Sequence, residues 1–548
     1  MPSKKKPQDP TTQTATQTTN AQTTNAQTTT TQTGANNTAS QTTANKIPAK
    51  KTDAKETATK KTTTDTTAAL SIAIALPKSL QHAQCVDLTR HRYQGKLLTQ
   101  ADSIALGKQQ RKAYPLKTLA AISQRPTAID ALSVYHWSNQ GRLAGLLPIR
   151  AKRMSVSPFT FFRGMPALML FDQAWQGQHS GLFQQICGDC HVSNFGGYAS
   201  PERNLLFGIN DFDETIVAPF EWDLQRLVAS ILIASQSFKY VESVGYKAIE
   251  KLLTSYLDGL EAHCSLSPLQ VWYEKIDTHK ILANTEDVTV RKRRHADFEK
   301  AKKNDAVKML PKLTERDTVT GLRAFKTDGE LQRPPHRGQP FFGGSHAFFD
   351  AYRDTLKSDR QVLFDRYDFT DVALKVVGVG SVGTVCAVAL FQDADHEPLI
   401  LQMKQAKASI LTPLLAKQFS HQGKRVVEGQ QLMQASSDIF LGYASLDNFE
   451  VDFYVRQLRD MKYSASLESM TAAHFYEYIE SCGHALAHAH TKAGNADTLM
   501  GYLGNGSEII AVMQGYAEQT AARNAQDYAQ FMNQIADGHI AVAGDEVL

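Results

Sequence analysis

The chain has 548 residues, which is too many for a single hydrophobic core, and its 42% apolar and 21% charged residues are ordinary for a globular protein. The net charge is +4, but residues 1–65 hold nine lysines against four acidic residues, which leaves −1 on the rest of the chain. This balance gives no reason to expect nucleic-acid binding, and no apolar run reaches the roughly 18 residues of a membrane span, so we expect a cytoplasmic protein with neither kind of partner.

Residues 1–67 are predicted to be a disordered tail. Thr, Gln, Asn and Ala dominate them, and such a composition buries too little apolar surface to offset the entropy of ordering the chain. The basic start MPSKKK precedes polar residues instead of an apolar segment, so we expect no secretory signal. Residues 68–77 are the first apolar run, and they are expected to be a strand or the start of the fold.

Residues 80–365 are predicted to form a mainly helical lobe. Residues 153–164 are an exception, because their aromatic pattern favours a strand. Residues 205–214 predict a strand that runs into a turn, and the apolar spacing over 221–238 predicts a buried helix. The charged segment 291–305 is expected to be a solvated helix face, with a phosphate-binding patch as the alternative.

A Pro/Gly-rich segment, 332–349, is predicted to be a domain boundary. After it, residues 366–462 are predicted to form a β-rich lobe that begins with strand, glycine turn, strand, turn and strand. A helix is expected at 424–436, followed by a strand pair at 449–461. Residues 463–548 are predicted to be helices that complete the helical lobe.

The glycines Gly378, Gly380 and Gly383 fit the pattern G-x-G-x-x-G-x-V. A dinucleotide fingerprint would need a helix at the third glycine, but β-branched and apolar residues follow, so we expect a hairpin between strands. Glycines let the N–H groups of such a hairpin approach phosphates, so Gly378, Gly380, Ser381 and Gly383 are predicted to bind a nucleotide. The alternative is an ordinary glycine hairpin without a ligand.

Lys404 stands alone among apolar residues on the third predicted strand, and a buried lysine needs an anionic partner. Glu428 follows 24 residues later within a predicted helix. Protein kinases use a strand lysine paired with a helix glutamate to place the phosphates of ATP. We therefore predict that Lys404 and Glu428 form a catalytic ion pair, with Lys404 also contacting the nucleotide.

Asp189 and Asn194 are five residues apart in GDCHVSN, which is the separation of Asp and Asn in kinase catalytic loops. In that chemistry the Asp accepts the proton of the attacking hydroxyl and the Asn holds a divalent metal. Asp211 follows an apolar strand, as a second metal ligand does, and Asp213 is close to it. We predict Asp189 as the base and Asn194, Asp211 and Asp213 as Mg²⁺ ligands; the alternative is a polar loop with turn-forming residues.

Three further features have ordinary structural explanations. Asp223 is expected to bond the backbone of the catalytic loop from the start of a helix. The H-x-x-x-H-x-H pattern at 484–490 has zinc binding as one interpretation and a helix-dipole interaction as the other. The C-x-x-C pattern at 187–190 has a redox interpretation, but reduced thiols are expected in the cytosol.

The segments GDCHVSNF and INDFDETIVAPFEWDLQRL resemble the aminoglycoside phosphotransferase pattern G-D-x-x-x-x-N, then I-D-F-x and D-L-A. This resemblance implies a kinase-like fold with Asp189 as base, Asn194 and Asp211 as metal ligands and Asp223 in a structural role. Cys187 departs from the pattern, because phosphotransferases usually have His before this glycine.

A larger set of segments resembles the bacterial domain of unknown function 2252 family over about residues 85–535. These segments are RMSVSPFTFFRG, GDCHVSNFGG, NDFDETIVAPFEWDLQRL, GVGSVGT, LQMKQAKAS and KRVVEGQQLMQASSDIFLG. This family implies little established activity.

The order of the motifs is inverted relative to a kinase. The catalytic loop (189–213) precedes the glycine turn (378–383) by about 165 residues, whereas in kinases the glycine loop comes first. We therefore predict an α+β, protein-kinase-like two-lobed fold that is circularly permuted. Residues 453–458 would be a hinge strand whose backbone meets adenine, and the helix 471–493 would precede the catalytic loop in space.

The leading functional prediction is an ATP- and Mg²⁺-dependent phosphotransferase that acts on a hydroxyl group of a small molecule or protein. One alternative is a nucleotide-binding module without catalysis. The other is a metal-dependent hydrolase that uses Asp189, His191, Asp211 and Asp213.

Overall fold

The computed structural model describes residues 85–544 with short gaps. The gaps are residues 91, 94, 123, 127–128, 304–305, 327–330, 333–344, 376–377, 416–418, 447–450 and 459–460. The chain clusters into two units, Met1–Glu56 and Thr57–Leu548, and every described residue belongs to the second. The predictions for the tail (1–67), for residues 68–77 and for the centre of segment 332–349 therefore lie outside the described residues.

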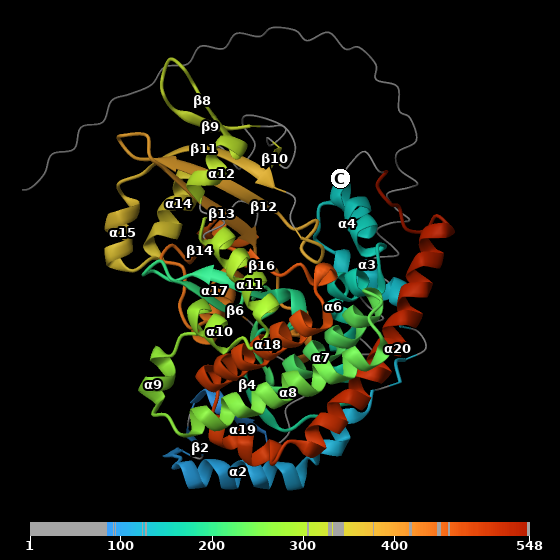
Figure 1. Cartoon of the computed structure of the whole chain (residues 1–548). Helices are drawn as coiled ribbons and strands as arrows, with labels where there is room; N and C mark the ends of the chain where they lie inside the picture. The colour runs from blue at the N-terminus through green and yellow to red at the C-terminus, as the bar shows by residue number, and fades with distance from the viewer. Residues whose placement is uncertain are drawn as a thin grey trace, which may run out of the picture. The chain divides into compact units, whose positions relative to one another are not determined.

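A six-stranded antiparallel sheet occupies much of residues 331–457 (Figure 1). Its strands are β10 (Leu331–Gln332), β11 (Asp368–Lys375), β12 (Cys386–Gln392), β13 (Pro398–Gln405), β14 (Gly442–Leu446) and β15 (Val451–Gln457), in the order β10-β11-β12-β13-β15-β14. The predicted succession of strand, glycine turn, strand, turn and strand is confirmed by β11, β12 and β13. The predicted helix that follows is α17 (Gln422–Met433).

Both faces of this sheet are covered at its centre, which explains why β12 is almost continuously apolar. On β12, Ala387, Ala389 and Phe391 pack toward helices α14 (Ser345–Asp354) and α15 (Ser358–Phe364). Val388 and Leu390 pack toward α12 (Ala306–Leu313) and β9 (Arg323–Phe325). Alternate side chains of a strand point to opposite faces, so burial of both faces requires an apolar residue at each position.

Two smaller sheets hold the loops that carry the predicted catalytic and metal-binding residues. β4 (Leu182–Ile186) pairs with β1 (Val86–Asp87) and β7 (Ile216–Pro219), and β5 (Phe195–Ala199) pairs with β6 (Leu205–Ile209) and β16 (Tyr463–Ser464). Because β4 pairs with β7 and β5 pairs with β6, loop 187–194 and loop 210–215 leave these sheets side by side.

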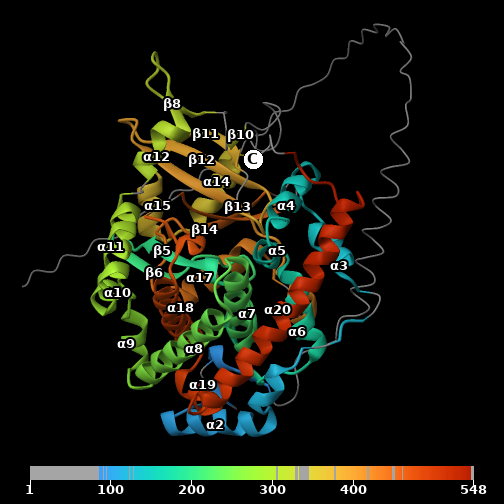
Figure 2. The ribbon, with the colours of Figure 1, turned by 45° about the vertical axis from the view of Figure 1, so that its right-hand side comes forward.

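The helical part is built around α7 (Glu221–Ser237), whose side chains are almost all buried, as the apolar spacing predicts. It packs on α8 (Glu242–Cys264) and α20 (Ser507–Ala536), and α8 packs on α18 (Ala472–Ala493). Figure 2 shows α20 running along α7 and α3 (Ala131–Asn139). The other elements are β2 (Arg92–Tyr93), β3 (Lys96–Leu97), α2 (Gln100–Ala113), α9 (Pro268–Tyr273), α10 (Thr278–Asn284), α11 (Val288–Lys302), β8 (Thr314–Arg316), α16 (Thr412–Leu415), α19 (Ala496–Leu503) and short 3-10 helices.

The strand predicted at 153–164 is wrong, because this segment is helical. Residues 147–176 form α4 (Leu147–Met154), α5 (Pro158–Gly164) and α6 (Pro166–Gln176). The Ser157 hydroxyl accepts from the Thr160 N–H at 3.1 Å, the Thr160 hydroxyl accepts from the Ser157 N–H at 2.9 Å, and Pro158 presets the first helical position. These caps, with burial of the aromatic side chains, outweigh the strand propensity of the segment.

Helix α17 joins the six-stranded sheet to the sheet that contains β4. It packs against β14 and β15 and also against β4 and α18. The approach is close at Gly429, where a Cβ atom would lie 2.4 Å from the methyl group of Thr215, so only glycine fits.

The described residues form a mixed α+β structure, as predicted. Segment 291–305 falls mainly on α11, and most of its charged side chains are exposed, which confirms the solvated helix face; Arg294 is buried. Within the described ranges, no helix combines the length and apolarity that a membrane crossing requires.

Candidate active site

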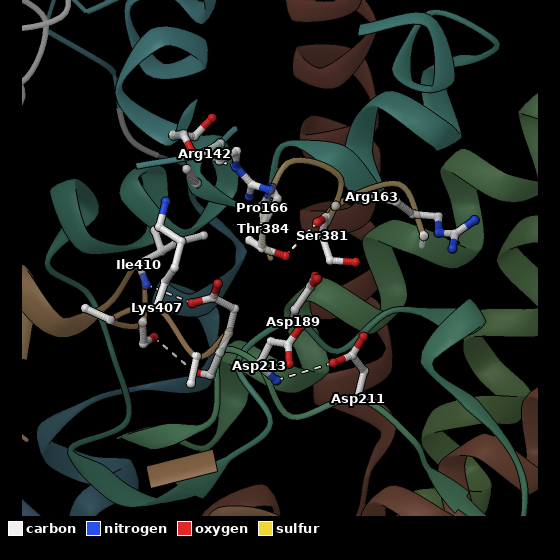
Figure 3. Close-up of a pocket in the computed structure, with 18 of the residues that line it drawn as sticks. Arg142, Arg163, Pro166, Asp189, Asp211, Asp213, Ser381, Thr384, Lys407 and Ile410 are labelled. Atoms are coloured by element: carbon white, nitrogen blue, oxygen red, sulfur yellow. Dashed lines mark hydrogen bonds between the residues drawn. The ribbon is translucent and has the colours of Figure 1, made fainter. Parts of the chain in front are cut away.

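A cavity of about 720 Å³ is lined by four segments that are far apart in the sequence, within 137–167, 189–214, 378–384 and 405–413. Seven of the site residues predicted from the sequence line this cavity: Asp189, Asn194, Asp211, Asp213, Gly378, Gly380 and Ser381. Lys404, Gly383 and Glu428 are not among the lining residues. The acidic loops and the glycine turn therefore open into the same space (Figure 3).

Asp189 lies just beyond β4 and is paired with a buried arginine. The Arg226 Nε donates to Asp189 Oδ1 at 2.5 Å, and the guanidinium lies 4.2 Å from the centre of the Phe162 ring. Burial raises the pKa of Asp189 to about 7, although Arg226 acts in the opposite direction. Asp189 is thus a carboxyl group that exchanges a proton near neutral pH.

Sequence reasoning missed Arg226, but a signal was present. Arg226 is a single cation in the middle of the apolar helix α7, and it is fully buried. A buried guanidinium needs acceptors, which here are Asp189 and the carbonyl oxygen of Phe162 at 3.1 Å.

Asn194 and Asp211 sit at the facing ends of the two loops. The Asn194 Nδ2 donates to the Asp189 carbonyl oxygen at 2.8 Å, which directs the amide nitrogen into the loop. The Asn210 N–H donates to the Asn194 carbonyl oxygen at 2.8 Å, and Asp211 Oδ1 accepts from the Asp213 N–H at 3.3 Å. The side-chain oxygens of Asn194 and Asp211 are hard donors on one cavity wall, a donor type that suits Mg²⁺.

Asp213 is engaged by the strand lysine. The Lys404 Nζ donates to both oxygens of Asp213 at 3.2 and 2.9 Å, and the Tyr454 hydroxyl donates to Oδ1 at 2.6 Å. Burial alone would raise the pKa of Asp213, but Lys404 and Tyr454 hold it below its ordinary value. Burial likewise opposes the charged form of Lys404, and Asp213 nevertheless holds the Lys404 pKa well above its ordinary value.

The predicted Lys404–Glu428 ion pair is not formed. The Glu428 side chain is 64% exposed on α17 and lies 3.7 Å from Lys424. The buried face of α17 presents Arg425 to the site instead, where it donates to the carbonyl oxygens of Thr215 and Asp213 at 2.6 and 2.9 Å. Helix α17 packs against β14 and β15 on one side and against β4 and α18 on another, and this packing leaves Glu428 on the face that points to solvent.

The glycine turn joins β11 to β12 as predicted and is held by segment 142–153. Arg153 donates to the Gly378 carbonyl oxygen at 2.6 Å and Arg142 to the Val382 carbonyl oxygen at 2.7 Å. Gly378 has φ +70° and Gly383 has φ +92°, values that favour glycine. Gly383 itself packs against Arg142 rather than facing the cavity.

The hinge role predicted for residues 453–458 gains no support from the structure. Phe453, Tyr454 and Val455 of β15 pair with β13 on one side and with β14 on the other, so their backbone groups are already used. None of the residues 453–458 lines the cavity. Alternation along β15 sends Phe453 and Val455 into the core and Tyr454 to Asp213.

Four cations of the cavity lining were not anticipated from the sequence: Arg142, Arg150, Arg163 and Lys407. Arg163 and Asp211 are drawn on one side of Asp189 in Figure 3, and Arg142 and Lys407 on the other. The cavity is therefore acidic in its floor and basic in its walls.

Asp223 anchors the catalytic loop, as predicted. Its carboxylate accepts from the backbone N–H groups of Cys187 and Gly188 at 2.8 and 3.0 Å. Cys187, Cys190 and Asp223 place ligand atoms within 4.8 Å of one another, the one group of this kind found in the described chain. Burial raises the pKa of both thiols, that of Cys190 to about 11, which is the opposite of a redox-active cysteine.

The H-x-x-x-H-x-H histidines do not converge. His490 Nε2 faces Asp223 at 3.4 Å, whereas the rings of His484 and His488 lie 6.2 and 5.7 Å from the His263 ring. In the part of the chain that the structure describes, none of the three belongs to a group able to hold a metal, so the zinc interpretation gains no support.

Comparison with known proteins yields one match. The model of a family described as "uncharacterized protein conserved in bacteria (DUF2252)" matches residues 142–534, which include every cavity-lining residue from Arg142 onward. No curated protein and no solved structure matches the chain.

Proposed function

The chain belongs to the bacterial DUF2252 family, and from its cavity we propose that it is an ATP- and Mg²⁺-dependent phosphotransferase that acts on a hydroxyl group. One observation carries the proposal: Lys404, on a strand reached through the glycine turn, bonds Asp213 in the acidic loop. Asp213, which holds Lys404, lines the cavity together with the hard oxygen donors of Asn194 and Asp211, and this set suits a nucleoside triphosphate with its metal.

The element order supports a circularly permuted, kinase-like two-lobed fold. A glycine turn lies between β11 and β12, Lys404 lies on β13, and α17, β14 and β15 follow. Kinases likewise carry their lysine on the strand that follows the glycine hairpin, with a helix after it. The chain departs from them in the partner of this lysine, because Asp213 takes the part that a helix glutamate plays in kinases.

Asn194 and Asp211 are the residues we propose for the metal. The Asn194 side-chain nitrogen is used within the loop, which leaves its oxygen for a ligand, and Asp211 lines the cavity. A bound Mg²⁺ would neutralise charge on the phosphates. Asp213, predicted as a third ligand, is committed to Lys404 and Tyr454 and is proposed to hold Lys404 in place.

Asp189 is the proposed base. In the proposed reaction, the acceptor oxygen bonds to the γ-phosphorus as the bond from that phosphorus to the bridging oxygen breaks. The hydroxyl proton passes to Asp189, and ADP and a phosphate ester are released. A pKa of about 7 allows Asp189 to be unprotonated before the transfer and still basic enough to accept a proton.

Thermal stability measured with ATP, Mg²⁺ and both together tests the proposal. A ligand at 100 times its Kd stabilises a protein by about 2.7 kcal/mol, so a clear rise in Tm is expected with ATP and Mg²⁺ together. Stabilisation by ATP without any effect of Mg²⁺ would favour the silent module, and stabilisation by Mg²⁺ alone the hydrolase. Asp211→Asn should remove the Mg²⁺ effect, whereas Asp359→Asn, an exposed acid beside Arg360, should keep it.

A further inference from the structure

One wall of the cavity is a cluster of cations that form no ion pair with any residue that the structure describes. Arg142 donates to the carbonyl oxygens of Ser138 and Val382 at 3.0 and 2.7 Å, and Lys407 donates to the carbonyl oxygen of Gln140. All of these acceptors are neutral oxygens.

Arg150 completes this wall and is its most buried member. It is 1% exposed, and it donates to Asn139 Oδ1 at 2.9 Å and to the Gly164 carbonyl oxygen at 2.5 Å. Its Nε is buried with no acceptor. Its other contacts, Met165 Sδ at 3.9 Å and the Tyr135 ring at 5.6 Å, are also uncharged, so nothing it touches balances its positive charge, and a buried guanidinium of this kind favours binding of an anion.

The three cations also repel one another. Burial, with Arg142 adding to it, lowers the pKa of Arg150 to about 9 and that of Lys407 to about 8. Glu214 attracts Arg142 and Lys407, and Asp213 also attracts Arg142. The Glu214 carboxylate is nevertheless used elsewhere, since it accepts from the Ile410 N–H at 2.7 Å and is attracted most strongly by Arg425.

We propose that Arg142, Arg150 and Lys407 bind an anionic group, a phosphate or carboxylate, of the acceptor substrate, and that this anchors its hydroxyl toward Asp189. This inference rests on the proposed function and adds the class of acceptor: a small anionic hydroxyl compound. Lys404, Asn194 and Asp211 are assigned to the nucleotide and its metal, which leaves this wall for the second substrate. In Figure 3, Arg142 and Lys407 lie on the side of Asp189 away from Asp211.

The anion on this wall could instead be a phosphate of the nucleotide. A competition experiment distinguishes an anion of the acceptor from a phosphate of the nucleotide. Inorganic phosphate is titrated calorimetrically into the full chain, first alone and then with saturating Mg²⁺ and a non-hydrolysable ATP analogue. An acceptor site predicts that phosphate binds in both cases. Loss of phosphate binding when the analogue is bound would assign the wall to the nucleotide and overturn the acceptor proposal.

Variants locate the binding. Lys407→Gln should weaken phosphate binding at least about tenfold, which is about 1.4 kcal/mol, and Arg142→Gln provides a second variant if the first fails to fold. Lys424→Gln is the matched control, because Lys424 is 48% exposed on α17 and pairs only with Glu428. The proposal is overturned if wild type binds no phosphate or if Lys424→Gln weakens it equally.

A third outcome separates this inference from the proposed function. If the ATP analogue does not bind at all, the phosphotransferase proposal fails, and the acceptor assignment fails with it. Phosphate binding that still depends on Lys407 would then mark an anion site of another kind, so the two failures are distinguishable.

Discussion

The Lys404 Nζ donates hydrogen bonds to both carboxylate oxygens of Asp213, at 2.9 and 3.2 Å, although 191 residues separate them in the sequence. This ion pair joins β13 of the six-stranded sheet to the loop before β7. The Lys404 side chain is 6% exposed and the Asp213 side chain is 31% exposed, so water reaches the carboxylate but hardly reaches the lysine. The contact ties the glycine-turn sheet to the acidic loops.

Replacing Lys404 should destabilise the fold far more than replacing Glu428. Lys404→Met leaves the Asp213 carboxylate without its cation, and breaking a buried pair in this way costs roughly 3 kcal/mol. Glu428→Gln should cost less than about 0.5 kcal/mol, because that side chain is exposed. Urea unfolding of both variants measures the difference, and equal losses would mean that the Lys404–Asp213 pair contributes no more than a surface contact.

The fall of kcat/KM at low pH, the acidic limb of the pH profile, should follow protonation of Asp189. A base must be unprotonated, so kcat/KM should rise with pH and level off above about 7, the raised pKa of Asp189. His191 lies beside Asp189, at 4.0 Å, but burial, Arg163 and Arg226 hold the pKa of His191 well below its ordinary value.

Two variants assign this limb. Asp189→Asn should lose at least about a hundredfold in turnover and keep its nucleotide affinity, as expected for loss of a general base. His191→Gln should keep a limb near pH 7. A limb that vanishes in His191→Gln would show that the titrating group is the histidine.

Arg226 is a positioning residue, and its removal should shift the pH profile. Arg226 lowers the pKa of Asp189 against the effect of burial, so Arg226→Leu should move the acidic limb to higher pH. Arg226→Lys keeps the positive charge but loses the bond to the Phe162 carbonyl oxygen, and its acidic limb should lie close to the pH of the wild-type limb. A purely structural role would lower turnover in both variants without moving the limb.

Glu221 should make the protein less stable as pH rises. Burial raises its pKa to about 7 even though its carboxylate accepts from the Ser180 N–H and hydroxyl, both at 2.6 Å. Between about pH 4.5 and 7 the unfolded chain loses this proton and the folded chain keeps it. The free energy of unfolding therefore falls with pH, by up to about 1.4 kcal/mol per unit for one such group.

Glu221→Gln removes this contribution. Denaturant unfolding at several pH values should show a shallower decline for the variant than for wild type over this range, with Glu242→Gln as a control at the start of another helix. Parallel curves would contradict a raised pKa at Glu221. The pKa of Asp189 is also raised, so Asp189 adds the same decline of stability with pH to wild type and to Glu221→Gln, and the difference between them reports Glu221.

Local patterns predicted most of the elements that carry the site. Helix α7 followed from apolar spacing, and the hairpin from β11 to β12 followed from glycines before a β-branched run. The bond from Asp223 to the loop backbone was also predictable, since an acid at a helix start accepts N–H groups from nearby backbone. Each of these depends on residues close together in the chain or on a recurrent local motif.

Other features depended on contacts that the sequence does not display. Segment 153–164 became helical because Ser157 and Thr160 cap it and its aromatic residues are buried. Arg142, Arg150 and Lys407 met at the cavity only because α4, the glycine turn and the end of β13 pack together. Arginines and lysines are common on surfaces, so their composition alone predicted no cluster.

The sequence by itself determined which chemical groups stand in the loops and on the strand: Asp189, Asn194 and Asp211 in one loop pair, and Lys404 on an apolar strand. Tertiary structure alone decided their partners, giving Lys404 to Asp213 and leaving Glu428 in solvent. The physical reason is that hydrogen bonds form only at contact distance and that the attraction between two charges weakens as the distance between them grows. The distance between two charges is set by how α17 packs between the sheets, and spacing along the chain carries no record of it.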